Sequence, residues 1–266
     1  HENPQGQWTC TCPSCLRHKA LTCTNMVLLG NRNCSLEISA AKDTFVKAYR
    51  DNEKYIDATR YLFLRSIRKL TLRFSDVIIK GESNVNKGGS IMETINENLE
   101  LLDFPRELPQ FDQTIKICDE LLKLSDKLEN ECLYNTISIN QIRNMESWAC
   151  IKADDGKKTI IIENADNMLP GVKNALLKIL EEPPEDCIFI LLTSRKNAVL
   201  PTILSRVRNY NFNIAFFFVS IRCDVNKYFF DNNHDLIFKF SVPIKRRHHK
   251  RLNIFKFTHF CLKNLF

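Results

Sequence analysis

Two short apolar runs separated by one amphipathic segment stand out in the second half of the chain. KKTIIIEN (residues 157–164) and CIFILLTS (187–194) are each long enough for one buried strand. Between them, LPGVKNALLKILEE (169–182) repeats apolar residues at helical spacing, with Pro170 suited to its first turn and Pro183 unable to continue it. Two buried strands joined by one helix predict a right-handed βαβ unit in a parallel sheet covered on both faces.

The same criterion predicts mainly helices in the first half. After a short apolar run at 26–30, helical spacing extends over 44–74 and over 91–133, where two prolines divide it into a hairpin. The polar stretch at 80–90 is expected to be a flexible loop, because it lacks the order of glycines and lysine that a phosphate-binding loop needs. Within RYLFLRSIRKLTLRF we expect a solvated basic face, with contact to a phosphate backbone as the alternative; its members are Arg60, Arg65, Arg68, Lys69 and Arg73.

Polar residues follow both predicted strands. Glu163 and Asn164 come after the first strand, and Thr193 and Ser194 come after the second. In parallel sheets, ligands bind beyond the carboxyl ends of the strands. ATP-hydrolysing enzymes place there one carboxylate that supports magnesium and a second acid that orients the attacking water. Asn164 cannot act as that base, and Glu163 is one methylene longer than the expected aspartate, so we predict a degenerate nucleotide site.

Composition and charge limit the function classes. The chain has 44% hydrophobic residues and no apolar run long enough to cross a membrane, so a soluble cytoplasmic protein is expected. Of its formal charge of +7, the excess lies in residues 213–266, which hold ten Lys/Arg and three Asp/Glu. The remaining body is neutral, which argues against a DNA-binding face over the whole protein. The opening His1 and the lack of a signal-peptide core suggest that the sequence begins inside a longer protein.

Four of the eleven cysteines are clustered, and the others occur singly. Cys10, Cys12, Cys15 and Cys23 lie close enough in sequence to bind a structural zinc, with His18 as another choice for the fourth ligand. The alternative is a set of reduced, packed thiols. Scattered single cysteines in a chain of 266 residues do not indicate a disulfide scaffold.

Several longer motifs point to one family. These are QIR (141–143), IIIENADNM (160–168), NALLKILEEPP (174–184), FILLTS (189–194) and LPTILSR (200–206). Together they resemble the delta-prime subunits of the bacterial DNA polymerase III clamp loader, which are related to gamma/tau. The resemblance implies an α/β fold of the AAA+ type, in which a parallel P-loop-type sheet is flanked by helices and is truncated here at its N-terminus.

The resemblance also implies an organisation along the chain. Residues 1–35 would form a small zinc module, 36–135 a helical insertion, and 136–212 the second half of the AAA+ core. Residues 213–266 form a basic, Phe-rich tail that departs from the helical domains expected at the end of the family's subunits. We interpret this tail as a divergent end or an out-of-frame extension.

The function that the resemblance implies is positional. Arg206 would be an arginine finger that acts in trans on ATP bound by a neighbouring gamma/tau subunit, with Ser205 opening a Ser-Arg-Cys motif whose third position is Val207. Ser194 would occupy the sensor position, beside the degenerate pair Glu163 and Asn164. The expected partners are gamma/tau and delta in a hetero-oligomeric ring, and through it the sliding clamp and primed DNA. The alternatives are an active gamma/tau-type ATPase and a zinc-ribbon nucleic-acid module.

Overall fold

A three-stranded parallel sheet organises the protein. The computed structural model describes residues 12–82, 85–153, 156–212 and 236–238. The strands are β1 (Met26–Leu29), β2 (Lys158–Ile162) and β3 (Cys187–Leu191), hydrogen-bonded in that order and all parallel. The sequence prediction of an α/β fold with a parallel sheet flanked by helices is therefore confirmed, including the βαβ unit formed by β2, a helix and β3.

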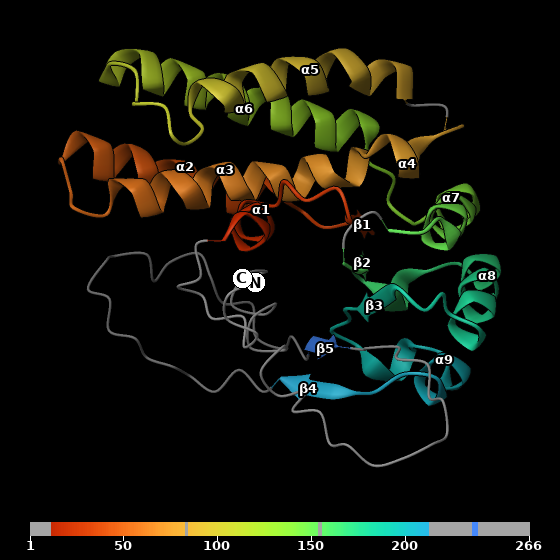
Figure 1. The fold of residues 1–266 in the computed structure, drawn as a ribbon. Helices are drawn as coiled ribbons and strands as arrows, with labels where there is room; N and C mark the ends of the chain where they lie inside the picture. Colours follow the sequence, from red (N-terminus) through yellow and green to blue (C-terminus); the bar gives the residue numbers. More distant parts are fainter. Residues whose placement is uncertain (1–11, 83–84, 154–155, 213–235, 239–266) are drawn as a thin grey trace.

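Helices cover one face of this sheet. They are α7 (Ile139–Cys150), α8 (Pro170–Glu181) and the short α9 (Pro201–Ser205), seen beside the strands in Figure 1. Alternate strand residues such as Ile160 and Phe189 pack here against Leu176 of α8. Proline fits the first turns of α8 and α9 because those positions need no intrahelical N–H donor. On the opposite face, a smaller apolar cluster includes Leu21 and Ile161.

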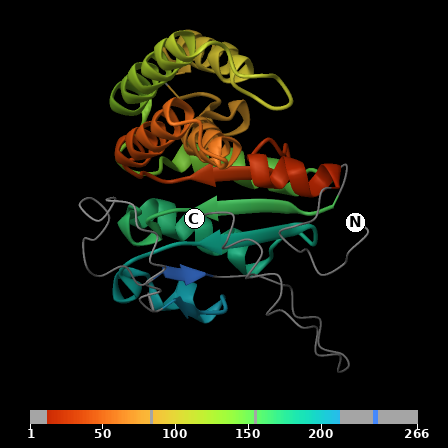
Figure 2. The ribbon, with the colours of Figure 1, turned by 90° about the vertical axis from the view of Figure 1, so that its left-hand side faces the viewer.

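A layer of four helices continues past the β1 edge of the sheet. It consists of α2 (Ser35–Arg50), α3 (Ile56–Thr71), α5 (Val85–Leu101) and α6 (Phe111–Cys132). These helices share a core of their own, whose fully buried members include Phe45, Phe63 and Leu121. Figure 1 shows this helical layer above the sheet, and Figure 2 shows the strands lying one below another beneath it. The chain leaves α3 through η1 (Leu72–Phe74) and α4 (Asp76–Ile79), which packs against α7, and it reaches α7 itself only after α5 and α6.

The helical layer confirms one prediction and corrects another. The helical spacing over 44–74 belongs to α2, which ends at Arg50, and to α3, which begins at Ile56. The expected loop at 80–90 is helical from Val85 onward, since α5 starts there. Tertiary packing accounts for this, since Gly88 of α5 lies against α6, where a Cβ on it would meet Leu128 and the Cys132 sulfur at an ordinary contact distance of 3.6 Å.

The prediction of a solvated basic face on 60–74 was also wrong. Arg60, Arg65 and Arg73 are each only 3% exposed, and Lys69 is 7% exposed. Arg60 shows why burial is tolerated, because its guanidinium donates hydrogen bonds to the carbonyls of Leu102, Asp103 and Arg106 at 2.7, 2.9 and 2.7 Å. These carbonyls follow the end of α5, where backbone acceptors lack helical partners.

The remaining elements are short. Helix α1 (Pro13–Ala20) precedes β1, and β4 (Tyr210–Phe212) pairs antiparallel with β5 (Leu236–Phe238). In the described ranges, no helix combines the length and the apolar character that a membrane crossing requires. Apart from 236–238, the predicted tail at 213–266 lies outside the described residues. The proposed division into a zinc module, an insertion and a core stays a prediction.

Candidate functional site

The carboxyl ends of β1 and β2 approach each other closely. Glu163 directly follows β2, and its N–H donates to the carbonyl of Leu29 at 2.9 Å. Gly30 follows β1 with φ of 104°, and a Cβ there would lie 2.2 Å from the Glu163 carbonyl oxygen. Only glycine fits this position, both for its backbone conformation and for the lack of space.

Two guanidinium groups bind the carboxylate of Glu163. Arg73 forms an ion pair with one oxygen, and Arg32 approaches the other at 3.3 Å. The side chains of Arg73 and Glu163 are 2% and 10% exposed, whereas that of Arg32 is 35% exposed. Arg73 also donates to the carbonyl of Gly30 at 3.1 Å. A magnesium ion needs free carboxylate oxygens, so Glu163 in this arrangement does not fit the role of a metal ligand.

This ion pair belongs to a larger network that reaches the helical layer. Glu37 of α2 binds Arg32 at 3.2 Å and also pairs with Lys69 of α3. The network therefore joins α2, α3 and η1 to the end of β2, through pairs up to 131 positions apart in the sequence, as between Arg32 and Glu163. Sequence reasoning missed it, because no periodicity links positions so distant.

Asn164 has a structural role in this arrangement. Its backbone is left-handed, with φ of 50° and ψ of 46°, a conformation that asparagine adopts more readily than most residues. Its side-chain amide donates to the carbonyl of Asn31, just after β1. The residue therefore fixes the loops that follow two neighbouring strands, and an amide offers no basic group to activate water.

A second polar cluster lies at the ends of β2 and β3. The buried carboxylate of Asp166 accepts a hydrogen bond from the Thr193 hydroxyl at 2.6 Å and from Arg195 Nε at 2.9 Å. Burial raises the pKa of Asp166, but these hydrogen bonds outweigh it and leave the pKa below its usual value. The sequence singled out Ser194, whereas the hydrogen bond to the acid comes from Thr193. The available signal was an apolar run that ends in threonine, together with an Asp three residues after IIIE.

Arg206 lies at the exposed end of α9. Its guanidinium donates to the Thr202 carbonyl at 2.7 Å and pairs with Glu181, at the end of α8, at 2.5 Å. The hydroxyl of Ser205 donates to the same Thr202 carbonyl at 2.9 Å. Both members of this ion pair are accessible to solvent, since the side chain of Arg206 is 33% exposed and that of Glu181 is 51% exposed. Within the described residues, no contact joins Arg206 to Glu163, so the two are not parts of one site in this chain.

The cysteines that the described residues include do not form a metal site by themselves. Cys12 precedes α1, Cys15 is buried within it, and Cys23 is buried near β1. Burial raises the pKa of the Cys23 thiol, which favours its protonated form. Across the described ranges, no group of three His, Cys, Asp or Glu residues is placed to hold a metal ion. Cys10 lies outside them, and zinc stays a prediction.

Comparison with known proteins identifies related sequences. Residues 112–215 match the family described as DNA polymerase III, delta subunit. The chain is 36% identical over 80 residues to the subunit delta' of Pseudomonas aeruginosa, which is 30% of this chain and 24% of that protein. It is 43% identical over 67 residues to subunit delta' of Bacillus subtilis (25% of this chain, 20% of that protein) and 47% identical over 55 residues to its subunit tau (21% and 10%).

The alignments thus span a quarter or less of each of these relatives. No solved structure is significantly similar to the chain. The matched segment runs from α6 to just beyond β4, and it includes Glu163, Asn164, Ser194, Ser205 and Arg206.

Proposed function

We infer that this chain works as a delta'-type subunit that hydrolyses no ATP itself. Through residues 112–215 it belongs to the delta'/gamma/tau family of DNA polymerase III clamp-loader subunits. The observation that carries this proposal is the state of Glu163. Its carboxylate is bound by Arg73 and Arg32, and the following residue is Asn164, which already donates to Asn31. Catalysis of phosphoryl transfer depends on a free metal-binding acid and a water-orienting group, and neither is offered here.

The contribution we propose for the subunit is Arg206. An arginine finger must be exposed, permanently charged and able to span two phosphate oxygens. Arg206 meets these needs at the end of α9, and Ser205 beside it closes the helix through Thr202. The Glu181 carboxylate is a surface partner, which a nucleotide phosphate can replace at small cost.

The wider assembly follows from the same proposal. ATP would be bound by neighbouring gamma/tau subunits, and the ring would contain delta as a further subunit. Through that ring the protein would take part in loading the sliding clamp onto primed DNA. A structural zinc held by Cys10, Cys12, Cys15 and Cys23 is part of this proposal, and metal analysis of the purified chain before and after Cys12→Ser tests it.

Turnover by the reconstituted clamp loader tests the function. With sliding clamp and primed DNA present, Arg206→Ala should lower ATP turnover by at least about tenfold, because an arginine finger stabilises the transition-state charge. The matched control is Arg208→Ala, which removes an exposed arginine two residues away. Unchanged turnover in an intact assembly with Arg206→Ala would refute the finger.

The competing function is an active gamma/tau-type ATPase, which the 47% identity to a tau subunit favours. Purified chain that hydrolyses ATP alone, with activity lost on Glu163→Gln, would establish it in place of the delta' proposal.

A further inference from the structure

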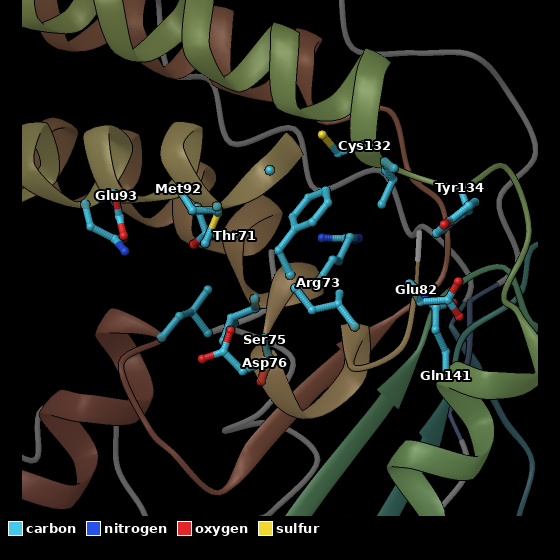
Figure 3. Close-up of a pocket in the computed structure, with 18 residues that line it drawn as sticks. Thr71, Arg73, Ser75, Asp76, Glu82, Met92, Glu93, Cys132, Tyr134 and Gln141 are labelled. Carbon is cyan, nitrogen blue, oxygen red and sulfur yellow. The ribbon is translucent and has the colours of Figure 1, made fainter. Parts of the chain in front are cut away.

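A cavity of about 500 Å³ lies between the helical layer and α7. Its walls come from η1, α4, α5, the link between α6 and α7, and Gln141 of α7 (Figure 3). Of the residues in the Glu163 network, Arg73 alone borders it. A volume of this size suits a small molecule or one or two side chains of a partner.

The deeper lining of this cavity is apolar. Phe74 is 8% exposed and Cys132 is 3% exposed, and the half-buried side chains of Leu72, Met92 and Leu133 complete the surface. Such a lining favours a ligand with an aliphatic or aromatic body, because burying that body removes apolar surface from water.

The mouth of the cavity is acidic. Asp76 and Glu93 are exposed, and within the described residues neither carboxylate has a hydrogen bond or an ion pair. Figure 3 shows Met92 and Glu93 on one side of the space and Ser75 and Asp76 on the other. The cationic group of Arg73 does not offset them, because its side chain is 2% exposed and bound to Glu163.

We propose that this cavity binds an organic cation, with its apolar body on Leu72, Phe74 and Met92 and its amine or guanidinium group at Asp76 and Glu93. Anionic ligands are disfavoured by the two unpaired carboxylates, although the whole chain carries a formal charge of +7. The same chemistry is present in a free alkylamine or alkylguanidinium and in a Lys or Arg side chain of a partner polypeptide.

Methionine methyl groups provide a direct measurement of binding. The chain has four methionines, and Met92 alone among them borders the cavity, whereas Met26, Met145 and Met168 are buried in the other cores. With the full chain labelled at the methionine methyl carbon, we would add n-butylguanidinium and record carbon–proton NMR spectra. Met92→Leu identifies the relevant signal. The charge-reversed comparison ligand is n-pentanoate.

The expected result is a saturable shift of the Met92 signal with n-butylguanidinium, while the other three signals stay in place. Combined Asp76→Asn and Glu93→Gln should weaken binding by about fivefold to tenfold, the sum of two exposed charge interactions. The matched control is Glu97→Gln, on the same helix but outside the cavity.

A second variant closes the cavity without removing charge. A Cβ at Gly89 would meet nothing within 4 Å, so Gly89→Leu can fill the space and is expected to abolish the shift. Gly171→Leu is its control, because that glycine is equally unobstructed and lies in α8.

The source of the cation is distinguished by a short blocked peptide, leucine-arginine-leucine. Tighter binding of this peptide than of n-butylguanidinium supports a polypeptide partner, and equal or weaker binding supports a small free cation. The proposal is overturned if the Met92 signal does not move, if n-pentanoate moves it equally, or if the doubly neutralised variant binds as tightly as the wild type.

Discussion

The buried ion pair between Arg73 and Glu163 should dominate the attachment of the helical layer to the sheet. Replacing Arg73 with methionine keeps an unbranched apolar stem but removes the guanidinium, and it leaves the Glu163 carboxylate 10% exposed with Arg32 at 3.3 Å as its one remaining cation among the described residues. The change also removes the hydrogen bond to the Gly30 carbonyl. Breaking one side of a buried pair costs about 3–5 kcal/mol of unfolding free energy.

The partner substitution separates charge from packing. Glu163→Gln alone should also be destabilising, because it leaves the Arg73 guanidinium buried at 2% exposure beside a neutral amide. The double variant Arg73→Met with Glu163→Gln has no uncompensated charge, and it should recover roughly 2 kcal/mol relative to the sum of the single changes.

Urea unfolding followed by circular dichroism measures these free energies. A loss of about 3–5 kcal/mol corresponds to a fall in melting temperature of roughly 6–20 °C for a domain of this size. Arg50→Met is the control, because it removes an arginine whose side chain is 61% exposed and paired with a neighbouring aspartate. A loss below about 1 kcal/mol for Arg73→Met, or simple additivity in the double variant, would contradict a buried, coupled pair.

Two further predictions concern titratable groups. The lowered pKa of Asp166 means that its ionised form stabilises the fold above about pH 4 and that this contribution is lost as the pH falls through the folded-state value. The difference in unfolding free energy between wild type and Asp166→Asn should therefore be about 1 kcal/mol at pH 7 and vanish in strong acid. Burial raises the pKa of Cys34 to about 11 and of Cys118 to about 12, so at pH 8 iodoacetamide should modify exposed Cys150 well before either, as read by mass spectrometry. Equal modification rates in the folded protein would contradict their burial.

The sequence by itself determined the second half of the fold. The runs at 157–164 and 187–194 and the proline-bounded helix between them contain their own periodicity and stop signals, and the structure has β2, α8 and β3 there. The same part of the sequence contains the motifs that point to the polymerase family. It also placed Glu163 and Asn164 at the end of a strand, at the edge of the sheet where the carboxyl ends of parallel strands meet.

Only the tertiary structure decided what those residues contact. The basic residues of 60–74 look like a solvated face in the sequence, because a charged residue gives no local sign of a distant acceptor. Folding brings Arg73 to Glu163 and Arg60 to the carbonyls after α5, and these acceptors make the burial of these two guanidinium groups possible. Such contacts depend on how separate elements pack, and neither helical nor strand periodicity encodes that packing.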